Sequence, residues 1–340
     1  MRSSATRQAL ARSPLLEVRN LRTYFTTKAG TVHAVDDISF EINAGETLGL
    51  VGESGCGKSM TALSILRLVP APAGRIVGGQ IIFEGEDLLT LSDQEMRRTR
   101  GSRIGIIFQD PMTSLNPVHR VGDQIAESAR IHLALPRRAA RRRAAELLQA
   151  VGIPRAEDRA NDYPHQFSGG MRQRVMIAIA LACDPALLLA DEPTTALDVT
   201  IQAQILELIR SLSEQRGMAV MLITHDLGIA AGMCDRVNVM YGGRIVETGG
   251  VETMFDRPRM PYTWGLMDSI PGVKAEHGSE LRAIEGMPPD LVNPTNACQF
   301  APRCRHARDI CREGEPQLTT RGDVDHAARC WGTEPGGWLA

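Results

Sequence analysis

The sequence lacks a hydrophobic run long enough to cross a membrane. Its most apolar stretch, residues 176–190, is interrupted by Asp184 and Pro185, whereas a membrane-spanning helix needs about 20 consecutive apolar residues. An apolar signal segment is also missing, because residues 1–13 are rich in arginine, serine and alanine. The sequence therefore predicts a cytoplasmic protein, with a disordered basic arm over residues 1–14, that needs a spanning partner for any role at a membrane.

Excess charge of one sign is lacking as well. The formal net charge is −2 over 340 residues, which gives no reason to expect a nucleic acid partner. Five arginines do cluster within residues 137–143, but no aromatic side chains interleave them. We therefore expect one solvated helix face there, rather than a patch that binds anionic lipid or RNA.

Cysteine is scarce, and its distribution is uneven. Of seven cysteines three are scattered, and the tail contains Cys298, Cys304, Cys311 and Cys330. A reducing cytoplasm argues against disulfides. The tail spacing differs from the C-x₂₋₄-C pairs of structural zinc sites, and four thiolates are the usual ligands of a 4Fe-4S cluster. Spacing alone leaves an iron-sulfur cluster, zinc and unliganded cysteines all open.

A glycine-rich segment, residues 52–59, is the strongest functional signal. Its sequence GESGCGKS fits the pattern G-x-x-x-x-G-K-[ST] and lies between an expected strand and an expected helix. In such a phosphate loop, backbone N–H groups and the helix N-terminus bind phosphates, Lys58 reaches the β- and γ-phosphates, and Ser59 ligates Mg²⁺. The alternative is an ordinary glycine-rich turn with a surface lysine. The expected nucleotide-binding residues here are Gly52, Ser54, Gly55, Cys56, Gly57, Lys58, Ser59 and Met60.

Polar side chains follow three further apolar runs that we expect to be buried strands. Because open α/β sheets bind ligands at the carboxyl ends of their strands, we expect these side chains to meet at one edge. They are Gln109, Asp191, Glu192 and His225, which follow residues 103–108, 187–190 and 219–224.

Phosphoryl transfer gives each of these side chains a role. Asp191 suits coordination of Mg²⁺, and Glu192 suits polarising a water molecule for in-line attack on the γ-phosphate. Gln109 is placed to contact Mg²⁺ or the attacking water, and His225 completes the set. The alternative, two acids that cap the turn at Pro193, leaves the phosphate loop unexplained.

The remaining segments surround this site. Residues 15–51 contain short alternating segments that predict antiparallel strands. Residues 121–134 and 138–151 have the apolar spacing of helices, and we expect them to belong to a helical insertion over about residues 111–180.

Two more features concern the nucleotide. Phe25 is placed to stack on a base, although a core aromatic is nearly as good an interpretation. Ser168, Gly169 and Gly170 begin an expected helix and form a second anion-binding nest. One phosphate loop needs only one such nest, so the second indicates a second nucleotide.

In this order and spacing, the motifs resemble those of the ATP-binding subunits of ABC transporters, over residues 15–266. The resemblance implies an α/β fold, a P-loop ABC-type nucleotide-binding domain over residues 15–265, with a RecA-like core, an antiparallel β subdomain and the helical insertion. Two such subunits would sandwich ATP, with Lys58 and Ser59 of one facing Ser168 and Gly170 of the other. Small departures are Met171, where glutamine is commoner, and Phe25, where tyrosine is usual. The matching motifs are the Walker A segment 52–59, the Q-loop Gln109, the signature Ser168-Gly169-Gly170, the Walker B segment 187–192, the D-loop Ala196-Leu197-Asp198 and the H-loop His225.

A narrower resemblance links the chain to the ATPase subunits of dipeptide, oligopeptide and nickel importers. It rests on DPMTSLNPVHRVGDQI (residues 110–125), RMPYTWGLMDSIP (residues 259–271) and CQFAPRCRHARDIC (residues 298–311). It implies a small Cys-rich C-terminal extension over residues 266–340. It also favours a 4Fe-4S cluster at the four tail cysteines, with zinc as the alternative.

This resemblance implies an ATP-hydrolysing subunit, peripheral on the cytoplasmic face of the inner membrane, that powers import of peptides. Its partners would be two membrane permeases, a second ATP-binding subunit, preferably a paralogue, and an extracytoplasmic solute-binding protein. The alternatives are an importer of nickel or another small solute, a soluble ABC-type ATPase of DNA repair or translation, and an iron-sulfur redox protein that also binds nucleotide.

Overall fold

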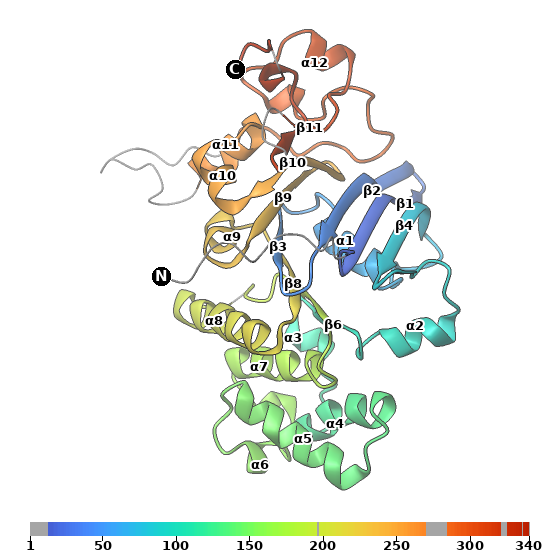
Figure 1. The fold of residues 1–340 in the computed structure, drawn as a ribbon, viewed down its shortest axis with the longest axis vertical. Helices are drawn as coiled ribbons and strands as arrows, with labels where there is room; N and C mark the ends of the chain where they lie inside the picture. The colour runs from blue at the N-terminus through green and yellow to red at the C-terminus, as the bar shows by residue number, and fades with distance from the viewer. Residues whose placement is uncertain (1–12, 196, 270–283, 321–324, 335, 340) are drawn as a thin grey trace.

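The computed structural model describes residues 13–195, 197–269, 284–320, 325–334 and 336–339. The expected arm over residues 1–14 thus lies almost entirely outside the described residues, as does Ala196 of the expected D-loop. Figure 1 shows two sheets side by side, with a group of helices beneath them and the C-terminal segment above.

The larger sheet has eight strands in the order β11-β12-β10-β9-β3-β8-β7-β6. Five neighbouring strands, β9, β3, β8, β7 and β6, pair in parallel. Every residue of β7 and β8 is buried, which explains why continuous apolar runs predicted them. The strands are β3 (Thr47–Val51), β6 (Ile104–Ile107), β7 (Leu187–Asp191), β8 (Ala219–Thr224), β9 (Arg236–Tyr241), β10 (Arg244–Gly250), β11 (Thr319–Thr320) and β12 (Ala327–Ala328).

The smaller sheet is antiparallel, in the order β2-β1-β4-β5. Its first two strands are longer than the short segments predicted from alternation, because register shifts interrupt the alternation without ending the pairing. One of these shifts lies between Val18 and Leu21. The strands are β1 (Leu16–Thr27), β2 (Gly30–Ile42), β4 (Gly74–Phe83) and β5 (Glu86–Asp87).

Five helices, α3 to α7, lie between β6 and β7 in the chain. The expected helices 121–134 and 138–151 are confirmed as α4 and α5, with ends shifted by one or two residues. Most of the clustered arginines of α5 are exposed, but Arg143 donates to Ala182 O (2.6 Å) and pairs with Asp184 (2.5 Å). The helices are α3 (Pro111–Ser114), α4 (Val121–His132), α5 (Arg137–Ala150), α6 (Ala156–Arg159) and α7 (Gly169–Ala180).

The other helices cover the sheets and the C-terminal segment. No helix in the described part of the chain is long and apolar enough to cross a membrane. They are α1 (Lys58–Ile65), α2 (Asp93–Thr99), α8 (Val199–Arg216), α9 (Leu227–Met233), α10 (Val251–Asp256), α11 (Pro261–Asp268) and α12 (Ile310–Glu313), with 3₁₀ turns at Pro164–Gln166, Ala301–Arg303 and Trp331–Thr333.

The C-terminal segment, residues 284–339, docks on the larger sheet. Strand β12 pairs antiparallel with β10, which places Ala328 opposite Glu247. The Glu247 carboxylate is fully buried and contacts His326 Nε2 at 2.8 Å. It also accepts the backbone N–H groups of Arg259 (2.5 Å) and Met260 (3.1 Å). The extension is therefore joined to the central sheet by backbone pairing and by one buried carboxylate.

Candidate active site

The glycine-rich segment forms a closed loop between β3 and α1. Lys58 is buried, and its Nζ donates to Gly52 O (2.7 Å) and Glu53 O (2.9 Å), so the loop curls around the ammonium group. Gly57 has φ +107°, and a Cβ there would lie 2.2 Å from Ala34 O, so this position requires glycine. The loop leads directly into the N-terminus of α1, where backbone N–H groups favour an anion.

Ser59 and Asp191 bring the loop and the end of β7 together. Ser59 Oγ donates to Asp191 Oδ1 at 2.9 Å. Burial raises the pKa of Asp191, and the charge of neighbouring Glu192 acts in the same direction. A hydroxyl and a carboxylate side by side are oxygen ligands of the kind that Mg²⁺ prefers. The chemistry of this pair therefore fits the predicted ion.

Glu192 is the meeting point of the other predicted side chains. Its Oε2 accepts Gln109 Nε2–H (2.9 Å) and Thr195 Oγ1–H (2.9 Å). Its Oε1 lies 3.4 Å from His225 Nδ1. The ends of β6, β7 and β8 thus converge on one carboxylate, as their parallel order predicted. Thr195 was missed, because a threonine in a turn carries no pattern that marks it.

The second nest lies at the start of α7. Ser168 caps the helix by accepting Met171 N–H at 3.4 Å, and a Cβ on Gly170 would lie 2.8 Å from Ile201 of α8. Asp198 caps α8 through Ile201 N–H at 3.0 Å. One group around the N-termini of α7 and α8 therefore contains Ser168, Gly169, Gly170 and Asp198.

Comparison with known proteins decides the family. Residues 35–195 match the ABC transporter family, and residues 246–311 match the oligopeptide/dipeptide transporter C-terminal region. A probable peptide ABC transporter ATP-binding protein of Sinorhizobium fredii is 55% identical over 317 residues, covering 93% of this chain and 94% of that one. The oligopeptide transport ATP-binding protein OppD of Bacillus subtilis is 52% identical over 321 residues, covering 94% and 89%. The chain belongs to the ATP-binding subunits of ABC transporters.

Solved structures agree with this family. A dimeric post-hydrolysis state of the ATP-binding cassette MJ0796, bound to ADP and Pi, superposes with a TM-score of 0.63 at 28% identity. The superposition covers 69% of this chain and 98% of that cassette. The ABC subunit is accordingly an ATPase with the mixed α/β fold of ABC cassettes.

Phe25 lies on β1, opposite Val32 on β2 and Gly74 on β4. Its half-buried ring packs over Gly74 beside Val69, since a Cβ on Gly74 would lie 2.5 Å from the ring. The structure thus places the predicted base-stacking residue on the antiparallel sheet, at a site where the ring also has protein contacts.

The four tail cysteines are free thiols in the ABC subunit. Cys298 N donates to Cys311 O at 3.1 Å, and burial raises the pKa of Cys298 to about 11, with the charges of Cys311 and Cys330 acting in the same direction. Within the described residues, however, no group of three or more Cys, His, Asp or Glu is placed to hold a metal ion. The described thiols are therefore not arranged as a ready-made metal site in this structure, either for the predicted cluster or for a single zinc ion.

Sequence reasoning also missed two residues that contact the phosphate loop. Tyr262 of α11 accepts Glu53 N–H through its Oη at 2.8 Å, and Arg303 of the C-terminal segment pairs with the Glu53 carboxylate. Both are more than 200 residues from Glu53, so no local periodicity could reveal them.

Proposed function

We propose that this ABC subunit hydrolyses ATP to power the import of peptides through two membrane permeases. The supporting observation is the convergence of Gln109, Thr195 and His225 on Glu192 beside the phosphate loop. The peptide substrate follows from the match of residues 246–311 to the oligopeptide/dipeptide transporter C-terminal region.

The chemistry follows from the geometry. The loop N–H groups and Lys58 would bind the triphosphate, and Ser59, Asp191 and Gln109 would hold Mg²⁺, which neutralises charge on the phosphates when bound. Glu192 would accept the proton of the attacking water. Gln109 and Thr195 donate to one carboxylate oxygen, which leaves the other, beside His225, to face the water.

Catalysis would require two subunits. Ser168, Gly169, Gly170 and Asp198 lie together around α7 and α8, and Ser168 and Gly169 are exposed. These four residues would complete the ATP site of a second ATP-binding subunit. The family resemblance favours a paralogue as that subunit. A Glu192→Gln chain mixed with that subunit and ATP should elute as a pair in size-exclusion chromatography. Elution as single chains would contradict the arrangement.

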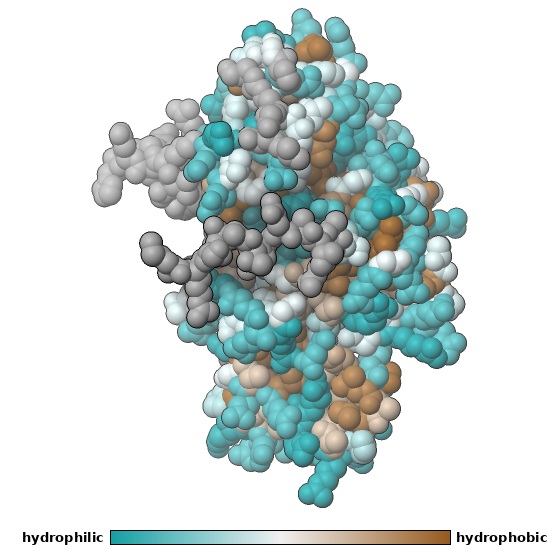
Figure 2. All heavy atoms as spheres, viewed as in Figure 1, coloured by the Kyte–Doolittle hydropathy of each residue, from teal (hydrophilic) through white to brown (hydrophobic). Residues whose placement is uncertain are grey.

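An apolar cavity offers a docking place for a permease loop. It has a volume of about 190 Å³ and is lined by Leu68, Phe108, Leu115 and Met176 among others. Figure 2 shows hydrophobic residues gathered over nearby α4, where Ile131 is exposed. Exposed apolar patches of this kind mark interaction surfaces. The segment that follows Gln109 borders this cavity, so motion at the ATP site would reach the permease there.

The solute decides between the remaining alternatives. In a transporter reconstituted with permeases and an extracytoplasmic solute-binding protein, peptides should stimulate ATP hydrolysis, and a Lys58→Ala chain should show no stimulation. Stimulation by nickel but not by peptides would overturn the peptide assignment. Failure to co-purify with integral membrane subunits would favour a non-transport ATPase.

We also propose that Cys298, Cys304, Cys311 and Cys330 bind a 4Fe-4S cluster. The four thiols belong to one segment, in which Cys298 N–H donates to Cys311 O at 3.1 Å. Burial, and after it the charge of other tail cysteines, raises the pKa of Cys298, Cys304 and Cys330. The residues fit by type, because four thiolates are the usual ligands of such a cluster. Anaerobically purified chain should be brown and contain iron, and Cys304→Ser should remove both while ATP binding survives. Colourless protein that contains one equivalent of zinc and no iron would show that these cysteines bind zinc instead of the cluster.

A further inference from the structure

The second residue of the phosphate loop is held by the C-terminal segment. Arg303 donates from Nη1 to Glu53 Oε2 at 2.6 Å and from Nη2 to Glu53 Oε1 at 2.9 Å. The Arg303 side chain is only 5% exposed. A two-pronged contact of a guanidinium with a carboxylate is among the stronger polar contacts in proteins, and it fixes orientation as well as distance. It joins residues 250 positions apart.

Arg303 is itself rigidly placed. Beyond Glu53, it donates to Glu285 O (3.0 Å), Ile284 O (3.2 Å) and Tyr241 Oη (3.4 Å). A guanidinium has five N–H donors, and these contacts use all of them. The guanidinium also lies 5.9 Å from the centre of the Tyr241 ring. The orientation of the guanidinium is therefore fixed by these groups as well as by Glu53.

The Glu53 backbone is held from the same side. Its N–H donates to Tyr262 Oη at 2.8 Å, and the Tyr262 side chain is fully buried. Tyr262 packs on Tyr241, with ring centres 4.5 Å apart, and on Phe300 of the C-terminal segment, with ring centres 5.4 Å apart. Both the carboxylate and the peptide group of Glu53 are thus fixed from outside the loop.

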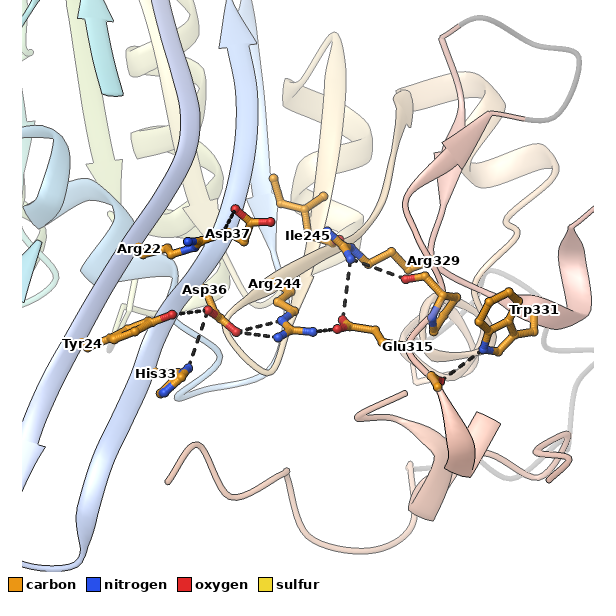
Figure 3. Close-up of polar contacts among 12 residues, drawn as sticks. Arg22, Tyr24, His33, Asp36, Asp37, Arg244, Ile245, Glu315, Arg329 and Trp331 are labelled. Carbon is orange, nitrogen blue, oxygen red and sulfur yellow. Dashed lines mark hydrogen bonds and ion pairs between the residues drawn. The ribbon is translucent and has the colours of Figure 1, made fainter. Parts of the chain in front are cut away.

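A second contact joins the same segment to the antiparallel sheet (Figure 3). Glu315 pairs with Arg244, which donates to Asp36 Oδ2 at 2.9 and 2.6 Å. Asp36 in turn accepts Tyr24 Oη–H at 2.6 Å, and Tyr24 precedes Phe25 on β1. Nη1 of Arg329, the residue before Cys330, lies 3.6 Å from Glu315 Oε1. The C-terminal segment therefore contacts the phosphate loop through Arg303 and β10 through Glu315, and Arg244 and Asp36 link Glu315 onward to Tyr24 of β1.

Charge gives the Arg303 contact a consequence for binding. Glu53 is a carboxylate within a loop that would receive an anionic triphosphate, and like charges repel. We propose that Arg303 is a positioning residue for the nucleotide: it cancels the Glu53 charge and fixes the loop, so that the C-terminal segment forms part of the ATP site. This inference rests on the proposed role of residues 52–59 in binding ATP.

The test compares ATP dissociation constants of full-length variants by isothermal titration. Arg303→Gln leaves the carboxylate uncompensated and should weaken ATP binding about tenfold, as expected for loss of a charge-assisted pair, with a smaller effect at high salt. Adding Glu53→Gln to it should restore the affinity to within about threefold, because the repulsion disappears. Arg305→Gln is the matched control, since Arg305 is exposed and flanks Cys304 on its other side.

A purely structural role predicts a different outcome. If Arg303 only folded the C-terminal segment, the double variant would bind ATP no better than Arg303→Gln, and that result would overturn the proposal. Affinity unchanged in Arg303→Gln would do the same. If that variant does not fold, Glu53→Gln alone carries the test: without the carboxylate, ATP affinity should stay at or above the parental value, and a tenfold loss of affinity would overturn the proposal. A Lys58→Ala chain that binds ATP normally would instead refute the phosphate site itself.

Discussion

Replacing Val118 with glutamate tests how the ATP site is connected to a permease. Val118 lies between α3 and α4, and it is 75% exposed. Its backbone N–H donates to Asn116 Oδ1 at 3.1 Å. The substitution should therefore change the folding free energy by less than about 0.5 kcal/mol, as most surface substitutions do.

The effect on docking should be much larger. Complete burial of a valine side chain is worth about 1.5–3 kcal/mol, and most of this side chain is available to a partner. Docking of the glutamate would lose about 1–2 kcal/mol of apolar contact and add at least about 1–3 kcal/mol for desolvating the carboxylate. The sum, about 2–5 kcal/mol, corresponds to docking weakened roughly thirtyfold or more.

The assay measures peptide uptake by the reconstituted transporter and ATP hydrolysis by the detached subunit. Val118→Glu should lower uptake strongly and leave hydrolysis near the parental rate. Val77→Glu is the matched control, because Val77 is 53% exposed but lies on β4. Leu115, which belongs to the same segment, is only 3% exposed, so a charge there would damage folding and would not report on coupling. Equal loss of uptake and hydrolysis in Val118→Glu, or no loss of uptake, would refute the reasoning.

Three further substitutions test other parts of the structure. Glu192→Gln should keep ATP affinity but slow hydrolysis by about 10²–10⁴, the usual contribution of a general base; parental turnover in the assembled transporter would contradict its role. Lys58→Ala should weaken ATP binding itself, because a charge at the centre of the loop is lost, and an unchanged binding isotherm would count against this. Glu247→Ala leaves His326 and two backbone N–H groups without their acceptor and should cost about 3–5 kcal/mol of stability. Its melting temperature should fall while that of the exposed control Glu252→Ala stays near the parental value, and equal melting would show that the buried carboxylate contributes little.

Much of the larger sheet could be predicted from the sequence. Strand β8 is an apolar run with both faces buried, so its composition alone marks it. Because parallel strands end at one edge, the same runs also placed Gln109, Glu192 and His225 together before the structure was known. That part of the site could be predicted because each of these polar residues directly follows its own apolar strand.

The remaining features depend on contacts between distant segments. Strand β12 has two alanines, too few residues for any periodicity, and it exists only because β10 and β11 pair with it. Arg303 looks like one of several arginines near Cys304, and only the folded chain distinguishes it from exposed Arg305. Strand pairing, burial and ion pairing between distant segments are set by tertiary packing, and no short stretch of sequence reveals them.

The pairing of β12 with β10 has a consequence for how the chain is made. Until residues 327–328 leave the ribosome, the outer edge of β10 near Glu247 and Thr248 has no partner. Unpaired strand edges recruit strands from other chains, and partly folded intermediates are the species most exposed to this. Because β12 (Ala327–Ala328) lies far behind β10 (Arg244–Gly250) in the chain, the nascent cassette carries an open edge from the time β10 forms until β12 emerges. Premature termination upstream of β12 would therefore release a chain prone to aggregate, even with every nucleotide-site motif intact.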